Sequence, residues 1–375
     1  MIRTIRTAGR TAALGAVALI AGLAGTVAPK PANWRFRAAI AVAATTAGLL
    51  GLPALAQATT RPPVTAAPAI TAYKFATHNN PVDPGYNNLH GINSKGVIAG
   101  YYGSPPPPPG QSDKGYPGGR ELGQPDKGYL LYPPYGPSDY VNENFPGSAQ
   151  TQVMGINNLG DTAGVAIAGD GDDDGWLLWN SAWWLIHHPW PCNALCEPVP
   201  YQAYGVNDAG IAVGDRTNPA GDSVAVRVNH ATGAVATITV PGSVSSVATA
   251  INNDGDIVGT GTTGAAASRG AARAGSTFGW LLHDGHLTTL QFPGSSYTQA
   301  LGINDHGEIV GDYRDSSGLT HGFVLTDPLS TLNWQTVDDP SGVGSTVVNG
   351  VNDAGELVGF YVDSAGNTNG MLAIP

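Results

Sequence analysis

The chain has 375 residues, of which 52 are Gly and 29 are Pro, while 42% are apolar and only 12% are charged. Disordered chains show the opposite balance, with few apolar and many charged residues, so this composition indicates a folded, turn-rich protein. The 17 Lys and Arg are outnumbered by 28 Asp and Glu, giving a net charge of −11. This excess argues against a nucleic-acid binder, whose affinity depends on neutralising phosphates.

The N-terminal part has the pattern of an export segment. Arg35 and Arg37 precede an apolar run over 38–52, and an Ala-Leu-Ala tripeptide ending at Ala56 follows it. A positively charged start, an apolar stretch and an A-x-A cleavage site are the plan of a secretory signal peptide. We therefore predict cleavage after Ala56, with Ala58 as the second choice, and an extracellular mature chain.

The predicted organisation is a signal segment over 1–56, a linker over 57–69 and one repeat domain over 70–375. A second apolar run over 12–28 leaves an alternative, in which this run anchors the protein on the outer surface of a membrane. The run is short and rich in Ala and Gly for a span. We therefore expect no membrane span in the mature chain.

Six copies of one pattern dominate the repeat domain. Each reads Gly/Ala-Ile/Val-Asn-x-x-Gly and is followed by an apolar run that usually ends in Gly; the Asn positions are 93, 157, 207, 252, 304 and 352. The period of about 50 residues suits four short strands with turns. The frequent glycines argue against long helices, so the domain is predicted to be all-β.

The fifth copy shows the four expected strands, A to D, in chain order. Strand A ends at Asn304, a hairpin turn containing Gly307 follows, and strand B covers 308–313. The Asn supplies a side-chain acceptor for the turn, and Gly tolerates the positive φ that a bulged hairpin needs. Strand C is expected from His321 and strand D near 334–337.

The two ends of the repeat domain complement each other. The sixth copy has strands A to C and no strand D, whereas the segment 71–75 before the first copy resembles a strand D without a repeat. A ring closed by pairing these segments leaves no exposed sheet edge. We therefore predict a six-bladed β-propeller of four-stranded antiparallel blades, closed by pairing of the N-terminal strand with the C-terminal blade.

The repeat Gly-Ile-Asn-Asp-x-Gly-x-Ile-Val-Gly, with a downstream His-Gly-Phe at 321–323, resembles the HAF-type repeat of bacterial extracellular proteins. The resemblance covers 70–375, and the second copy departs from it at Thr162 and Ala163, the third at 225–227. It implies an exported, propeller-like protein. It implies no catalytic residues, and none are predicted here.

Four long links contrast with the short A–B turns. They are the B–C links of copies one, two and four, at 103–126, 169–175 and 260–276, and the D–A link at 189–200. In a four-stranded antiparallel blade, B–C and D–A links leave at the same edge, so all four lie on one face. Repeat scaffolds commonly bind partners through such a face. We predict that it binds an unknown extracellular glycan or protein.

The acidic link reads Asp-Gly-Asp-Asp-Asp-Gly over 170–175. Its alternate carboxylates, Asp170, Asp172 and Asp174, can turn inward around a hard cation such as calcium. An EF-hand would need Glu at the position of Ser181, and a solvated acidic turn explains the same residues without a metal. Both interpretations stay open.

Five of the eight tryptophans fall within 15 residues. Trp183, Trp184 and Trp190, with His187 and His188, are candidates for a platform on which a sugar ring or an apolar group stacks. Packing between blades is the alternative for these tryptophans.

The two cysteines of the chain are Cys192 and Cys196. In an oxidising compartment such a close pair is expected to form one local disulfide. The alternative is a mixed zinc site with the nearby histidines.

Three functions remain open at this stage. The leading one is a secreted, monomeric, non-enzymatic binding module that uses the face with the long links. The second is a secreted propeller hydrolase or lyase, although no Ser/His/Asp order or paired-carboxylate motif recurs. The third is a structural surface protein.

Overall fold

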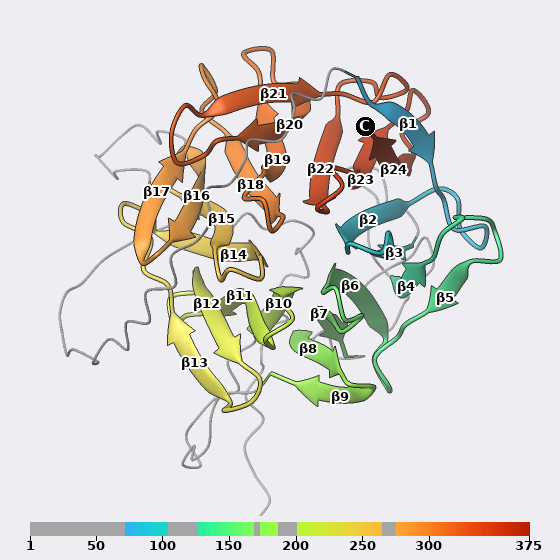
Figure 1. Ribbon diagram of the computed structural model, residues 1–375, viewed down its shortest axis with the longest axis horizontal. Helices are drawn as coiled ribbons and strands as arrows, with labels where there is room; N and C mark the ends of the chain where they lie inside the picture. Colours follow the sequence, from blue (N-terminus) through green and yellow to red (C-terminus); the bar gives the residue numbers. More distant parts are fainter. Residues whose placement is uncertain (1–71, 104–125, 169–172, 187–200, 265–274) are drawn as a thin grey trace, which may run out of the picture. The chain divides into compact units, whose positions relative to one another are not determined.

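The computed structural model describes residues 72–103, 126–168, 173–186, 201–264 and 275–375. Within these residues there are 24 strands in six four-stranded sheets, and no helix. The sheets are arranged as a ring around a central axis (Figure 1). The prediction of an all-β, six-bladed propeller is confirmed.

Each copy of the repeat forms one blade, and strands A to D follow one another from the axis outward. Blades 1 to 3 are β2 (Asn87–Ile92), β3 (Ile98–Tyr102), β4 (Lys127–Leu131), β5 (Tyr140–Asn142); β6 (Gln150–Ile156), β7 (Thr162–Ile167), β8 (Asp173–Trp179), β9 (Ala182–Leu185); and β10 (Tyr201–Val206), β11 (Ile211–Thr217), β12 (Ser223–Asn229), β13 (Ala234–Thr237).

Blades 4 to 6 continue in the same order. They are β14 (Ser245–Ile251), β15 (Ile257–Thr262), β16 (Thr277–His283), β17 (His286–Leu290); β18 (Thr298–Ile303), β19 (Ile309–Arg314), β20 (Thr320–Thr326), β21 (Asn333–Val337); and β22 (Thr346–Val351), β23 (Leu357–Val362), β24 (Thr368–Ile374), β1 (Lys74–Thr77).

Blade 6 combines the N-terminal strand with the last three strands. β1 pairs antiparallel with β24, with Lys74 opposite Ile374 and Thr77 opposite Met371, and the two strands lie side by side in Figure 1. Tyr73, just before β1, packs against the buried side chains of this blade without joining the ladder. The repeat that lacks its own strand D thus receives one from the other end of the domain.

The A–B turns form as the repeat Asn and Gly predict. In all six copies the Asn Oδ1 accepts a hydrogen bond from the backbone N–H four residues later, at 2.8–3.0 Å. The Gly three residues after the Asn has positive φ in every copy, between 73° and 98°. Only Gly adopts this backbone conformation without strain, which explains its recurrence.

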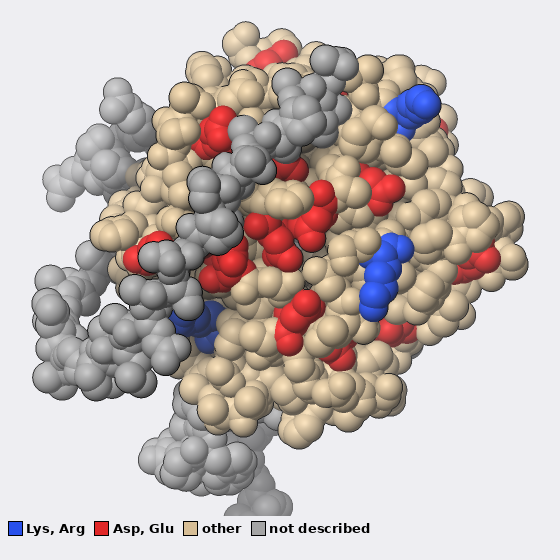
Figure 2. All heavy atoms as spheres, in the orientation of Figure 1, with Lys and Arg blue, Asp and Glu red and all other residues tan. Residues whose placement is uncertain are grey.

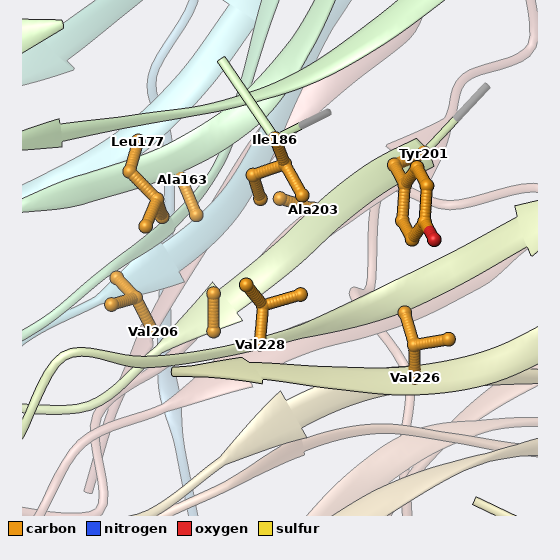
Figure 3. Close-up of a cluster of buried hydrophobic side chains, with 9 residues drawn as sticks. Ala163, Leu177, Ile186, Tyr201, Ala203, Val206, Val226 and Val228 are labelled. Atoms are coloured by element: carbon orange, nitrogen blue, oxygen red, sulfur yellow. The ribbon is translucent and has the colours of Figure 1, made fainter. Parts of the chain in front are cut away.

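The core lies between neighbouring blades rather than inside any one of them. Figure 3 shows one such cluster, in which Leu177 and Ile186 of blade 2 meet Ala203, Val206 and Val226 of blade 3. Equivalent buried clusters lie between the other blades. Each blade is therefore stabilised by both neighbours, as expected for a repeat that cannot bury its faces alone.

A glycine in strand B has a packing role that the sequence pattern alone does not reveal. A Cβ on Gly259 or Gly311 would overlap the carbonyl oxygen of the bulged strand A beside it, and would press on the ring of Trp280 or Phe323 in strand C. The absent side chain lets a large ring lie flat across strand B. This explains the Gly that ends the Ile-Val-Gly part of the repeat.

The predicted signal segment and linker lie outside the described residues. Among the residues that are described, no helix is long and apolar enough to cross a membrane.

Candidate functional site

A closed ring of hydrogen bonds runs around the axis at the A–B turns. The Nδ2 of each repeat Asn donates to the backbone carbonyl oxygen of the repeat Asn in the next blade, at 3.0–3.2 Å. The series runs from Asn93 to Asn157 and onward until Asn352 donates back to Asn93. Each amide therefore holds its own turn through oxygen and the next blade through nitrogen.

The residues that follow the repeat Asn form a second ring outside the first. At five of the six blade junctions a side-chain Oδ1 accepts the backbone N–H of the preceding blade, at 2.8–2.9 Å. Asn253 also donates from Nδ2 to Asp208 at 3.2 Å and to Asp305 at 2.9 Å. The six rim residues are Ser94, Asn158, Asp208, Asn253, Asp305 and Asp353.

These rings surround a hollow of about 60 Å³ on the axis. Besides the polar rings, it is lined by the six aliphatic residues that precede the repeat Asn: Ile92, Ile156, Val206, Ile251, Ile303 and Val351. A water molecule needs roughly 10–15 Å³ on this measure, so the hollow holds a few waters. Sites for drug-sized molecules span about 300–1,000 Å³, so the hollow is several times smaller than such a site.

The charge around the hollow is strongly negative. From the repeat Asn to four residues later, the six turns contain eight Asp or Glu and one basic residue, Lys95. Figure 2 shows acidic side chains gathered toward the centre of the face that it views. In the described part of the chain no group of three His, Cys, Asp or Glu has the arrangement of a metal site. The hollow thus suits ordered water or a small cationic group.

Toward the opposite end of the axis the inner strands carry amides beside buried carboxylates. Gln152 donates from Nε2 to Asp126 at 2.8 Å. In the strand registers, Gln202 stands opposite Asp215 and Gln299 stands opposite Asp312. All three carboxylates are buried. Buried polar groups therefore lie toward this end of the axis, whereas the hollow at the other end has an aliphatic wall.

Asp312 has a perturbed carboxyl. Its residue is 3% exposed, and burial raises the pKa of Asp312 to about 7, against a smaller lowering by Arg314. Its Oδ1 has no hydrogen-bond partner among the described residues. A carboxyl that changes charge near neutral pH is a recognised mark of functional sites.

His90 is the histidine of the inner strands. Its ring stacks on Tyr101, with centroids 5.4 Å apart and planes 19° apart. Burial lowers the pKa of His90 to about 4, so the imidazole is neutral at pH 7. Its Nε2 makes no hydrogen bond within the described part of the chain.

The predicted calcium loop falls largely outside the described residues. Asp170 and Asp172 are not described, whereas Asp174 lies in β8 opposite Ala166 and is half-buried. The calcium interpretation stays a prediction.

The aromatic candidates are divided by the structure. Trp183 faces inward and meets Trp176 and Phe145 edge to face, with ring centroids 4.9 and 5.3 Å apart. Trp184 is 50% exposed and meets His230 of blade 3 at 4.7 Å. Successive residues of β9 point to opposite faces, so the two tryptophans do not form one platform. The other candidates, His187, His188, Trp190, Cys192 and Cys196, lie outside the described residues.

The ring of amides and the polar inner positions were missed from sequence. Turn chemistry accounts for only the oxygen of the repeat Asn, and its nitrogen acts between blades. A detectable signal did exist: Gln recurs five residues before the repeat Asn in copies two, three and five.

Comparisons with known proteins give similarity of fold only. No protein-family model matches the chain, and no curated protein matches it either. Among solved structures, TolB from Acinetobacter baumannii is 11% identical over 66% of this chain and 59% of its own, with a TM-score of 0.43. AofleA from Arthrobotrys oligospora is 12% identical over 82% and 88%, at 0.42. The GH93 alpha-L-arabinofuranosidase of Fusarium graminearum is 10% identical over 80% and 97%, at 0.44.

The chain spans less than two thirds of the first of these structures, and 40% of a similar prolyl endopeptidase. Identities this low carry no information about binding or catalysis.

Proposed function

We propose that this chain is an exported, non-enzymatic binding module built from HAF-type repeats. The observation that supports it is the difference between the two edges of the propeller. At the A–B edge the blades are locked together by a closed ring of hydrogen bonds and by a second set at five of the six blade junctions. All four long links belong to the other edge, where they connect β3 to β4, β7 to β8, β9 to β10 and β15 to β16.

This division lets the links change without disturbing the scaffold. The inner strands contact one another around the whole ring, and the described bonds that hold the A–B turns join residues of those turns to one another. Loops on a rigid scaffold are where recognition residues concentrate. The hollow at the locked edge admits only small groups, so a glycan or protein partner is proposed to bind at the edge with the long links.

A binding array tests this proposal directly. The chain is compared with a variant in which all four long links are replaced by short Gly-Ser links, on a panel of glycans and surface proteins. The proposal expects a ligand for the chain, loss of binding in the variant, and an unchanged melting temperature. A matched control shortens the β12–β13 turn, at the other edge. Retained binding after removal of the links contradicts the proposal, and failure to bind any ligand favours a structural surface protein.

One observation favours an enzyme as the second candidate. Asp312, with its pKa raised to about 7, is matched to proton transfer near neutral pH. A secreted hydrolase or lyase would then turn over a carbohydrate or peptide substrate, and Asp312→Asn would abolish turnover while leaving binding intact. Turnover that survives this substitution removes the candidate.

A further inference from the structure

An unusual pair of side chains lies where β19 ends, on the edge with the long links. The guanidinium carbon of Arg314 lies 4.1 Å from the centre of the Tyr297 ring. Among described residues the ion pairs are made by His283 and His321, so Arg314 has no carboxylate partner there. A guanidinium stacked on an aromatic ring keeps its N–H donors directed outward in the ring plane.

The two residues are held together by their backbones. Arg314 N donates to the carbonyl oxygen of Tyr297 at 3.0 Å. The Ser295 hydroxyl lies 2.6 Å from the Arg314 carbonyl oxygen and 2.7 Å from that of Tyr297. The link between blades 4 and 5 is thus fixed to the end of β19. Because its backbone is already ordered, the guanidinium loses less freedom on binding a partner.

An amide and a buried carboxyl complete the group. The Tyr297 hydroxyl donates to Gln299 Oε1 at 2.7 Å, so the amide oxygen is engaged and its Nε2 has no hydrogen bond to a described residue. Opposite Gln299 in the register lies Asp312, which is buried and whose Oδ1 has no described partner.

The nearby acids do not neutralise Arg314. Asp315, the residue after Arg314, and Asp338 on the same edge are both engaged by His321, at 3.4 Å from Nε2 and 2.9 Å from Nδ1. Asp312 is buried beneath the surface. The group therefore offers N–H donors from the exposed Arg314 and the half-buried Gln299, together with the phenolic oxygen of the half-buried Tyr297.

We propose that Arg314, Tyr297 and Gln299 form a subsite for a hydroxylated carboxylate, such as a uronic-acid residue of an extracellular polysaccharide. This inference rests on the proposed binding function and names its ligand class. A carboxylate accepts two parallel hydrogen bonds from a guanidinium, a fit that an ammonium or a neutral sugar lacks. The Gln299 N–H and the Tyr297 oxygen match the donor and acceptor character of a neighbouring sugar hydroxyl.

Asp312 makes the subsite sensitive to pH. Its pKa of about 7 results from burial. Arg314 of β19 lowers this pKa, Tyr297 of the β17–β18 link interacts electrostatically with the Asp312 carboxyl, and Gln299 of β18 lies opposite Asp312 in the strand register. Protonation removes a negative charge behind the guanidinium, so a bound anion is held more tightly below pH 7 than above it. This pH dependence of anion binding distinguishes the subsite from a surface arginine, which attracts anions at any pH.

The test is calorimetric titration of the chain with trigalacturonic acid, its methyl ester and an acidic Glu-rich peptide. We expect binding of the acid, and at least tenfold weaker binding of the ester. Arg314→Gln should weaken binding at least tenfold, and Arg314→Lys should restore it only in part. The matched control is Arg227→Gln, which removes an exposed arginine of β12 and should leave binding unchanged.

Asp312→Asn supplies the second readout. It should abolish the difference in affinity between pH 5.5 and pH 8 while retaining binding. If Arg314→Gln and Arg227→Gln weaken binding of trigalacturonic acid equally, the arginine acts only through general charge attraction, and the proposed subsite is wrong. Binding of the peptide in place of the sugar overturns the ligand class. If trigalacturonic acid fails while the array finds another ligand, the subsite is wrong and the binding module stands.

Discussion

The two edges of this propeller join the strands of a blade in different ways. At the A–B edge six turns of equal length repeat one set of hydrogen bonds, and each Asn amide links two blades. At the other edge the bonds between blades do not repeat around the ring; Ala225 N donates to Ser246 Oγ at 3.2 Å, and Thr320 N donates to the carbonyl oxygen of Gly344 at 3.1 Å. The loop at Asn218 is held by bonds within itself, from the N–H groups of Ala220 and Asp222 to the Asn218 side chain. One edge therefore carries a closed, repeated ring of bonds between blades, whereas the links at the other edge differ in length and bonding from copy to copy.

The two edges also differ in whether their buried polar atoms have hydrogen-bond partners. At the A–B edge the repeat Asn side chains are satisfied on both their oxygen and their nitrogen. Toward the opposite edge, the described atom Asp312 Oδ1 is buried without a partner. Unsatisfied buried groups are destabilising and call for an explanation other than stability. Polar function is therefore expected at the variable edge, and structural function at the locked edge.

The largest expected effect lies at Asp312. Its pKa in the folded chain is about 7, raised by burial from 3.8. Between these values the folded state keeps a proton that the unfolded state has lost, so the free energy of unfolding falls as pH rises from about 4 to 7. The fall amounts to roughly 4 kcal/mol at about 1.4 kcal/mol per pKa unit.

Asp312→Asn should remove this fall, so that the variant matches the wild type near pH 4 and exceeds it at pH 8. Urea denaturation from pH 4 to 8 measures the difference. Asp284→Asn is the control, because that carboxylate is exposed and its loss should change little. Parallel pH profiles for wild type and Asp312→Asn would show that the carboxyl is hydrated in solution, and would weaken the contrast between the edges.

The next effect concerns Gly311 of β19, where an added side chain has no room. Gly311→Ala places a Cβ against the carbonyl oxygen of Gln299 and the ring of Phe323, so strand A or the ring must shift. We expect a loss of about 3 kcal/mol, in the range found for overpacked cores. Gly294→Ala is the control, because it has positive φ (80°) but nothing within 4 Å of the added atom, and it should lose about 1 kcal/mol. Thermal melting compares the two, and equal losses would mean that backbone strain, not packing, decides.

The fold could be predicted from the sequence because its evidence is repetitive. Six Asn at similar spacing define six units, and the missing last strand finds its counterpart in the segment before the first copy. β1 begins at Lys74, three residues later than the segment predicted from sequence. The reason is that pairing starts opposite Ile374, and Tyr73 packs before the ladder begins.

The site could be predicted only in part, because its contacts join blades. The sequence shows that Asn304 starts a turn, but not that the carbonyl of Asn352 lies within reach of its amide. Likewise, Gln299 and Asp312 are 13 positions apart and become neighbours only through strand register. Conversely, the adjacent Trp183 and Trp184 are close in sequence and were predicted to share a platform, but adjacent positions in a strand lie on opposite faces.

The amide ring itself can be measured by comparing two asparagines. Asn304→Ala removes the bonds within the turn and the bond to Asn352, and we expect a loss of about 2 kcal/mol. Asn218→Ala removes equivalent loop bonds without any bond between blades, and should lose about 1 kcal/mol. Chemical denaturation gives both values. If the two losses are equal, the bond between blades adds nothing and closure depends on the aliphatic clusters instead.

The smallest effect tests whether the variable edge tolerates change. Burial alone would lower the pKa of His321, but its contacts with Asp338 and Asp315 outweigh this and raise it above 6.5. The stabilisation is therefore complete below pH 6.5 and is lost as pH rises through the raised pKa. Because these carboxylates are partly exposed, His321→Gln should change stability by only about 0.5 kcal/mol, and only at lower pH. Melting curves at pH 5.5 and 9 measure this. A loss as large as that of Asn304→Ala would mean that this edge also helps to hold the ring, and that its links cannot vary freely.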